Sequence, residues 1–249
     1  MSYRLGRRAP GQTGEVCEEV PLGGGALTDG VVRVGETVRR PSGSATSRVR
    51  DVLLHLERVG FDAAPRWQGL DDQGRETLSW IEGDTFIERG RLHPYIGDPP
   101  DRIFFSDDQI AAAMLLLRRY HDAFDSGVVC HGDFGPWNLV WRGGIPAAII
   151  DFDDVYPGDP ADDVAYALRM FVSYGLAPFE PGEFVRRTER ALAAYGRGFE
   201  VPSILDHEYD RAEERCRRNG FARQLEKLSK ERAWLAENRN VLATARLRR

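Results

Sequence analysis

The stretch from residue 129 to 141 contains residue types that a phosphoryl-transfer reaction needs. A short apolar run leads into the polar loop His131-Gly132-Asp133, and Asn138 follows five residues after the aspartate. A Gly-Gly turn and a further apolar run then lead to Asp151 and Asp153. Phosphoryl transfer needs an acid that orients the acceptor hydroxyl, and oxygen ligands that hold Mg²⁺ on the phosphates. Asp133 is therefore a candidate base, and Asn138 and Asp151 are candidate Mg²⁺ ligands.

Each of these residues also has a purely structural explanation. Asp133 and Asn138 are of types that are common in ordinary turns, and Asp151 ends an apolar strand, where a solvated acid is unremarkable. The combination favours chemistry, because the apolar runs between Asn138 and Asp151 have the length of a hairpin. Such a hairpin brings the two polar ends together.

The same residues resemble the aminoglycoside phosphotransferase and choline kinase-like superfamily, which contains protein-kinase-like small-molecule kinases. His131 to Asn138 matches its catalytic-loop pattern H-G-D-x-x-x-x-N, and Ile150 to Asp153 matches its metal-binding I-D-F-D/E. Gly158 to Ala165 is similar to the helix start G-D-P-x-x-D-L/V-A that follows in the family. The three motifs occur in the family's order within residues 128–172.

The resemblance implies roles for individual residues. Asp133 would be the catalytic aspartate, with His131 beside it bracing the loop, and Asn138 and Asp151 would hold Mg²⁺. Asp163 would hold the backbone of the catalytic loop, although an acid in the first turn of a helix is also favourable by itself. The donor would be ATP or GTP, and the acceptor a hydroxyl group of a small molecule.

The resemblance also places a cation over the nucleotide phosphates, on the third strand. Only Lys227 and Lys230 are lysines, so this cation must be an arginine. Arg39 and Arg40 are the two candidates, and comparison with relatives that read L-R at this point favours Arg39. The family's partner glutamate on the next helix is not evident. Val49 stands at its expected place, and Asp51 and Glu57 are the available acids nearby.

Two further segments are candidates for nucleotide contact. Trp80, Ile81 and Glu82 lie where a kinase hinge would bind a purine through its backbone, although Trp80 and Ile81 would also suit a strand core. The Gly-rich run from Leu22 to Ala26 would cover the phosphates or form a plain turn.

The pattern of elements predicts an α+β, bilobal protein-kinase-like fold. Strands are expected at 30–34, 37–40, 65–70 and 76–81, and a helix capped by Ser47 is expected to continue to residue 59. Helices are also expected after a capping box at 106–109, from Asp159-Pro160, over 181–195, and from 201 with a break at 219–220. We expect residues 1–82 to form an abbreviated nucleotide-binding lobe and residues 83–249 to form the catalytic and substrate-binding lobe.

Net charge, apolar runs and cysteine content indicate which classes of partner and which location to expect. A net charge of −5 does not favour a nucleic-acid partner, and no apolar run is long enough to cross a membrane. The start of the sequence lacks the apolar core of a signal peptide, and the three cysteines are far apart, so a reducing cytoplasmic location is expected.

The acceptor remains open at this level. Candidate residues to face it are Trp137, Asp154, Tyr156, Glu213 and Glu214, whose acids would suit a cationic acceptor; the two glutamates would equally fit a solvated helix face. The alternatives to a kinase are a related protein that binds nucleotide or ligand without transferring phosphate, and an interaction module built on the charged C-terminal helices.

Overall fold

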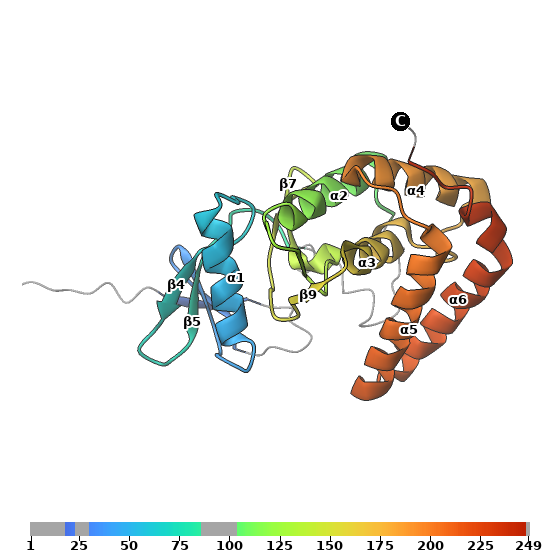
Figure 1. Cartoon of the computed structure of the whole chain (residues 1–249). Coiled ribbons are helices and arrows are strands. Elements are labelled where there is room, and N and C mark those ends of the chain that lie inside the picture. The colour runs from blue at the N-terminus through green and yellow to red at the C-terminus, as the bar shows by residue number, and fades with distance from the viewer. Residues whose placement is uncertain (1–17, 23–29, 86–103, 248–249) are drawn as a thin grey trace, which may run out of the picture.

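The computed structural model describes residues 18–22, 30–85 and 104–247. Within these ranges, a five-stranded antiparallel sheet and one helix form one end of the molecule (Figure 1). Five helices and two small two-stranded sheets form the other end. This arrangement confirms the expected α+β, kinase-like fold class. The lobe boundary after residue 82 stays a prediction, and residues 23–29 and 86–103 lie outside the described ranges.

The five-stranded sheet has the strand order β1-β2-β3-β5-β4. Its strands are β1 (Glu19–Pro21), β2 (Val32–Val34), β3 (Thr37–Arg40), β4 (Trp67–Leu70) and β5 (Glu76–Ser79). The predicted hairpin around Gly35 is present as β2 and β3. Strand β3 pairs with β5 in a register that sets Arg40 directly opposite Glu76. Arg39 is therefore opposite Thr77, on the other face of the sheet.

Helix α1 (Thr46–Arg58) packs its apolar face under this sheet, with Leu53 and Leu56 fully buried. Its beginning differs from the expectation, because Ser47 lies inside the first turn rather than at the N-cap. The Oγ1 of Thr46 instead accepts a hydrogen bond from the amide of Gly43 at 2.8 Å. Val59, expected on the apolar face, is 43% exposed because the helix ends one residue before it.

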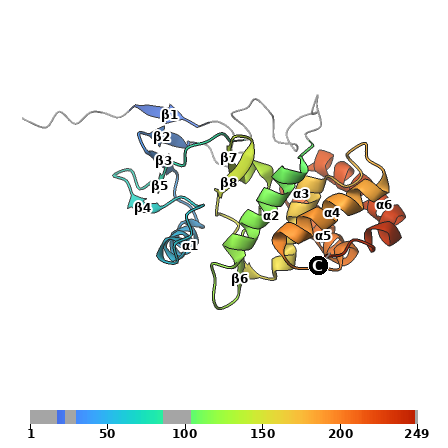
Figure 2. The same ribbon diagram turned by 90° about the horizontal axis from the view of Figure 1, so that it is seen from above.

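Two small antiparallel sheets lie between the N-terminal sheet and the helices (Figure 2). In one, β6 (Val128–Cys130) pairs with β9 (Tyr156–Gly158); in the other, β7 (Leu139–Arg142) pairs with β8 (Ile145–Ile149). The β7–β8 hairpin turns at Gly143 and Gly144, which both have positive φ, as a tight hairpin turn requires. This is the predicted hairpin between Asn138 and Asp151.

The helical end contains α2 (Asp107–His121), α3 (Pro160–Val172), α4 (Pro181–Tyr195), α5 (Val201–Asn219) and α6 (Ala222–Leu242). The predicted capping box at Ser106 and Gln109 begins α2, and the Asp159 side chain caps α3. One hydrophobic cluster runs from α1 through α2 and α3 to α6, so both ends share a core. No helix in the described ranges is long and apolar enough to cross a bilayer.

Candidate active site

Asp133 is held in place by three side chains that donate to its carboxylate. Tyr166 of α3 donates to Oδ1, while Asn138 donates to Oδ2 at 2.8 Å and Trp137 donates to the same oxygen at 3.3 Å. The Asn138 amide also donates to the Asp133 carbonyl at 2.9 Å. These contacts hold the carboxylate in one orientation.

The loop geometry around Asp133 depends on Gly132, which has a φ of +81°. A Cβ at this position would lie 2.4 Å from the backbone oxygen of Asp154. Because that neighbour is backbone, it cannot move aside as a flexible side chain would. The glycine therefore lets the catalytic loop lie directly against the segment that follows Asp151.

Asp151 and Asp153 lie at the end of β8, near Asn138. The backbone amide of Ile150 donates to the Asn138 carbonyl at 2.9 Å, which joins the two polar ends of the hairpin. Asp151 has a φ of +64°, in the left-handed region that a non-glycine residue adopts at a cost of roughly 1–3 kcal/mol. Strain of this kind occurs mainly at functional sites.

The environment of Asp151 disfavours its charged form. Loss of surrounding water and repulsion by Asp153 raise the pKa of Asp151 to about 6, against the opposing attraction of Arg40. The charge of Asp133 contributes to the same rise, so the two ends of the hairpin interact electrostatically. Such a crowded group of acids is expected where a cation binds.

Arg40, rather than Arg39, points into this group. Its guanidinium contacts Asp153 at 2.6 Å and Asp151 at 3.4 Å, and its Nε donates to Glu76 at 2.6 Å. Asp153 and Glu76 raise the pKa of Arg40, although burial alone would lower it. Arg39 instead contacts Asp71 at 3.2 Å and Thr37 at 3.2 Å. The structure therefore does not bring Arg39 to the other predicted site residues.

Glu76, which the sequence analysis did not single out, is the acid that pairs with Arg40. It is 1% exposed and lies on β5, not on the helix. The two acids considered on α1, Asp51 and Glu57, are exposed, and neither contacts Arg40. The available signal for Glu76 was that charged residues occur on both neighbouring strands. Which acid faces Arg40 depends on the register in which β3 and β5 pair.

Asp163 of α3 binds the backbone of the loop that contains His131 and Gly132. Its two carboxylate oxygens accept hydrogen bonds from the amides of His131 (2.6 Å) and Gly132 (2.9 Å). His121 donates to the same carboxylate at 2.9 Å and contacts the Tyr195 hydroxyl at 2.8 Å through its other ring nitrogen. Although burial opposes the charge, the His121 hydrogen bond and the nearby histidines hold the pKa of Asp163 below its usual value.

His131 is fully buried, in contact with Phe134 and Phe152. Its Nε2 donates to the Ile150 carbonyl at 3.2 Å, which ties the catalytic loop to the strand that carries Asp151. Its Nδ1 has no hydrogen-bond partner in the described ranges. The role of His131, a brace of the loop in the resemblance, stays a prediction.

The predicted hinge lies at the exit of β5. The Trp80 amide donates to Glu36 at 2.8 Å, its indole donates to Glu82 at 2.9 Å, and the Glu82 carbonyl accepts from Arg142 at 2.9 Å. No hydrogen bond to the backbone of Ile81 occurs within the described ranges. Within the described ranges, the Trp80 carbonyl and the Glu82 amide likewise have no backbone hydrogen bond, so the contact of this segment with a purine stays a prediction.

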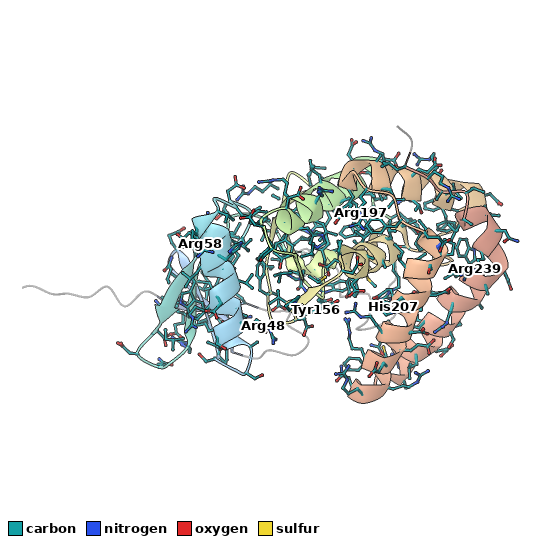
Figure 3. All side chains as sticks on the ribbon, in the orientation of Figure 1. Arg48, Arg58, Tyr156, Arg197, His207 and Arg239 are labelled. Carbon is teal, nitrogen blue, oxygen red and sulfur yellow. The ribbon has the colours of Figure 1, made fainter. Side chains whose placement is uncertain are left out.

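The other side of Asp133 is formed by α3, β9 and α5. Tyr156 and His207 lie close together there, and both contact Asp162 (Figure 3). Glu213 faces away from this region, because it pairs with Arg217 and with Arg232 of α6. Tyr166 was missed at the sequence level, since it reads as one more apolar position of α3.

The donor set suits Mg²⁺. No cluster of three or more His, Cys, Asp or Glu side chains that could hold a metal alone occurs in the described ranges. Mg²⁺ does not need one, because it is usually bound by one or two carboxylates together with substrate phosphates and water. The Asn138 amide nitrogen is engaged by Asp133, so its oxygen is directed elsewhere and is available with Asp151.

Comparison with known proteins shows which family and which fold the chain resembles. Residues 101–200 match the phosphotransferase enzyme family, also called APH. Chains in the ternary complex of streptomycin, ATP and APH(2")-IIa superpose with a TM-score of 0.54, at 13% identity, over 87% of this chain and 93% of that chain. The chain has the aminoglycoside phosphotransferase fold. The resemblance stated from the three motifs is thus confirmed.

The chain is also similar to a macrolide phosphotransferase and to a toxin immunity protein. Macrolide 2'-phosphotransferase MphH from Brachybacterium faecium has a TM-score of 0.50, at 14% identity, over 82% of this chain and 86% of that chain. The trifolitoxin immunity protein of Rhizobium leguminosarum bv. trifolii is 34% identical over 163 residues. That match covers 56% of this chain and 57% of the immunity protein, so it spans little more than half of that relative's length.

Proposed function

We propose that this protein is a small-molecule kinase that transfers the γ-phosphoryl group of ATP or GTP to a hydroxyl group. The observation that carries the proposal is the Asp133 carboxylate, held by Tyr166, Asn138 and Trp137 beside the oxygen ligands Asn138 and Asp151. The family match over residues 101–200 supports it independently.

In this proposal Asp133 accepts a hydrogen bond from the acceptor hydroxyl and takes its proton as the new P–O bond forms. Tyr166 and Asn138 keep the carboxylate oriented, so little reorganisation is needed during the reaction. Mg²⁺, bound by Asn138 and Asp151, would neutralise the negative charge of the donor phosphates. Arg40 would contact the phosphates from the sheet side, and Ile81 would bind the purine edge through its backbone.

The experiment that tests this proposal measures nucleotide binding and ADP release separately. Mg²⁺ and ATP or GTP together should raise the melting temperature more than nucleotide alone, and Asp151→Asn should remove that Mg²⁺-dependent part. Asp133→Asn should lower the rate of ADP release by roughly 10²–10⁴-fold while changing nucleotide affinity little. Asp72→Asn, which removes an exposed acid from the β4–β5 turn, is the matched control.

Two outcomes would contradict the proposal. A wild-type protein whose melting temperature responds to no nucleotide is not a kinase. Equal ADP release by the wild type and Asp133→Asn would show that Asp133 does not take part in the reaction, and it would not bear on the fold.

A second candidate function is protection against a toxin by binding alone. Its support is the 34% identity to the trifolitoxin immunity protein. Expression of the wild type and of Asp133→Asn in cells challenged with trifolitoxin separates the two candidates. Protection by both proteins would favour binding, and protection by the wild type alone would favour phosphoryl transfer.

A further inference from the structure

One face of α5 carries charged residues at helical spacing beside Asp133. Glu208, Arg211 and Arg215 are separated by three and four residues, so they lie on the same face, which is the one that packs against α3. Glu208 pairs with Arg169 of α3 at 3.0 Å, and Arg211 pairs with Asp162 at 2.7 Å. Two of the three charges are thus compensated by partners on α3.

Arg215 is the exception. It is half-buried, and no carboxylate within the described ranges forms a hydrogen bond or ion pair with it. Its guanidinium lies over the Tyr166 ring, 5.6 Å from the centroid. Burial lowers the pKa of Arg215, but attraction by Tyr166, Glu208 and Asp133 outweighs it, so the pKa is raised and the group stays charged.

Tyr166 connects this cation to the reactive carboxylate. Its hydroxyl donates to Asp133, while the guanidinium groups of Arg215 and Arg169 lie 5.6 Å and 5.3 Å from the centroid of its ring. The charge of Arg169 is already balanced by Glu208 and by Glu231, 3.7 Å away. Arg215, which forms no ion pair within the described ranges, therefore lies one tyrosine side chain away from Asp133.

We propose that Arg215 binds an anionic group, a carboxylate or a phosphate, of the acceptor whose hydroxyl meets Asp133. The charges of Glu208 and Asp133 keep this half-buried guanidinium charged, but no ion pair within the described ranges occupies its N–H groups, and its planar fork fits the paired oxygens of both anions. A polycationic acceptor such as an amino sugar would meet the positive charge of Arg215 in this place. Of the three acids expected to receive such a cation, Asp154, Glu213 and Glu214, Glu213 is engaged by Arg217 and Arg232.

The inference rests on the proposed kinase function, because an acceptor exists only if phosphate is transferred. The test of anion binding at Arg215 does not depend on that function. Sulfate is the probe, and the full-length protein is melted in sulfate and in chloride of equal ionic strength, with and without saturating Mg²⁺ and ATP. Nucleotide fills the phosphate positions beside Arg40, so the remaining sulfate effect reports other sites. Sulfate also stabilises proteins generally, which is why variants must be compared.

Arg215→Met and Arg218→Met are the matched pair, since both remove one arginine from the same helix and Arg218 is exposed without a partner in the described ranges. Wild type and Arg218→Met should show the same sulfate-dependent rise in melting temperature. In Arg215→Met the rise should be smaller by about 3 °C. Equal sulfate effects in all three proteins would overturn the proposal.

The acceptor class is tested by ADP release with glucose, glucosamine, gluconate and glucose 6-phosphate, which share a six-carbon hydroxylated frame. The two anions should exceed glucose by roughly tenfold, about 1.4 kcal/mol, and Arg215→Met should abolish that advantage. Comparison of gluconate with glucose 6-phosphate then distinguishes a carboxylate from a phosphate. Preference for glucosamine over the other three would overturn the proposal.

The two failures are distinguishable. If the kinase function is wrong, wild type shows no Mg²⁺-dependent response to nucleotide, whatever sulfate does. If only the acceptor inference is wrong, nucleotide still stabilises all three proteins, while Arg215→Met responds to sulfate like Arg218→Met.

Discussion

The placement of Arg39 and Arg40 shows how one residue of strand register decides a site. Successive side chains of a strand point to opposite faces, so only one of the two arginines can face the catalytic half. The sequence predicts an arginine at this point of β3 but contains no local signal for the face. Pairing of β3 with β5 sets Arg40 opposite the buried Glu76, and this long-range contact resolves the choice.

Glu76 should therefore position Arg40 for the nucleotide. Glu76→Gln keeps the size of the side chain but removes the charge that holds the guanidinium. We expect the KM for ATP to rise roughly tenfold, since hydrogen bonds to charged groups contribute about 1.5–3 kcal/mol, with a smaller change in kcat. Glu57→Gln on α1 is the control, and a steady-state titration of ATP checks both. If Glu57→Gln raises the KM for ATP as much as Glu76→Gln does, Glu76 is not the acid that specifically positions Arg40.

At the scale of elements, the catalytic loop is coupled to helices α2 and α3. The helix start at Asp159-Pro160 and the hairpin before Asp151 were predictable from local sequence, because capping residues and turn glycines act over a few positions. The buried contacts of His121 with Asp163 and Tyr195 were not, because these partners are 42 and 74 residues from His121 and only tertiary packing joins them.

Loss of this contact should destabilise the whole loop. Asp163→Asn is expected to lower the free energy of unfolding by roughly 3 kcal/mol, because it leaves buried donors without a charged acceptor. The pKa of Asp163 is lowered in the folded state, so its contribution is present above about pH 4 and is lost as pH falls through the folded pKa. Urea unfolding of wild type and variant at pH 7, and again below pH 4, should show the gap narrowing. A gap that is constant with pH would contradict a charged Asp163.

At the scale of the molecule, polar contacts add to the shared hydrophobic core in joining the N-terminal sheet and α1 to the catalytic half. Arg40 and Arg48 both bind Asp153, one through its carboxylate and the other through its carbonyl at 2.6 Å. Backbone hydrogen bonds add Ala63 to Ile149 and Asp84 to Trp141. The sequence predicts two parts from composition and motif order, but the contacts between them depend on relative orientation, which no local pattern encodes.

These contacts differ in burial, and hydrogen–deuterium exchange should separate their contributions. Arg40 is buried and fully paired, so Arg40→Met should raise exchange strongly in β3, β5 and residues 151–155. Arg48 is exposed, so Arg48→Met should raise exchange in α1 and residues 152–155 only slightly, by less than about 1 kcal/mol in opening free energy. Arg50→Met, from the same helix, removes an arginine whose one ion pair among the described residues is with its neighbour Asp51, and it should change neither segment. If Arg50→Met loosens residues 152–155 as much as Arg48→Met does, the general charge of α1, and not the contact with Asp153, holds the two parts together.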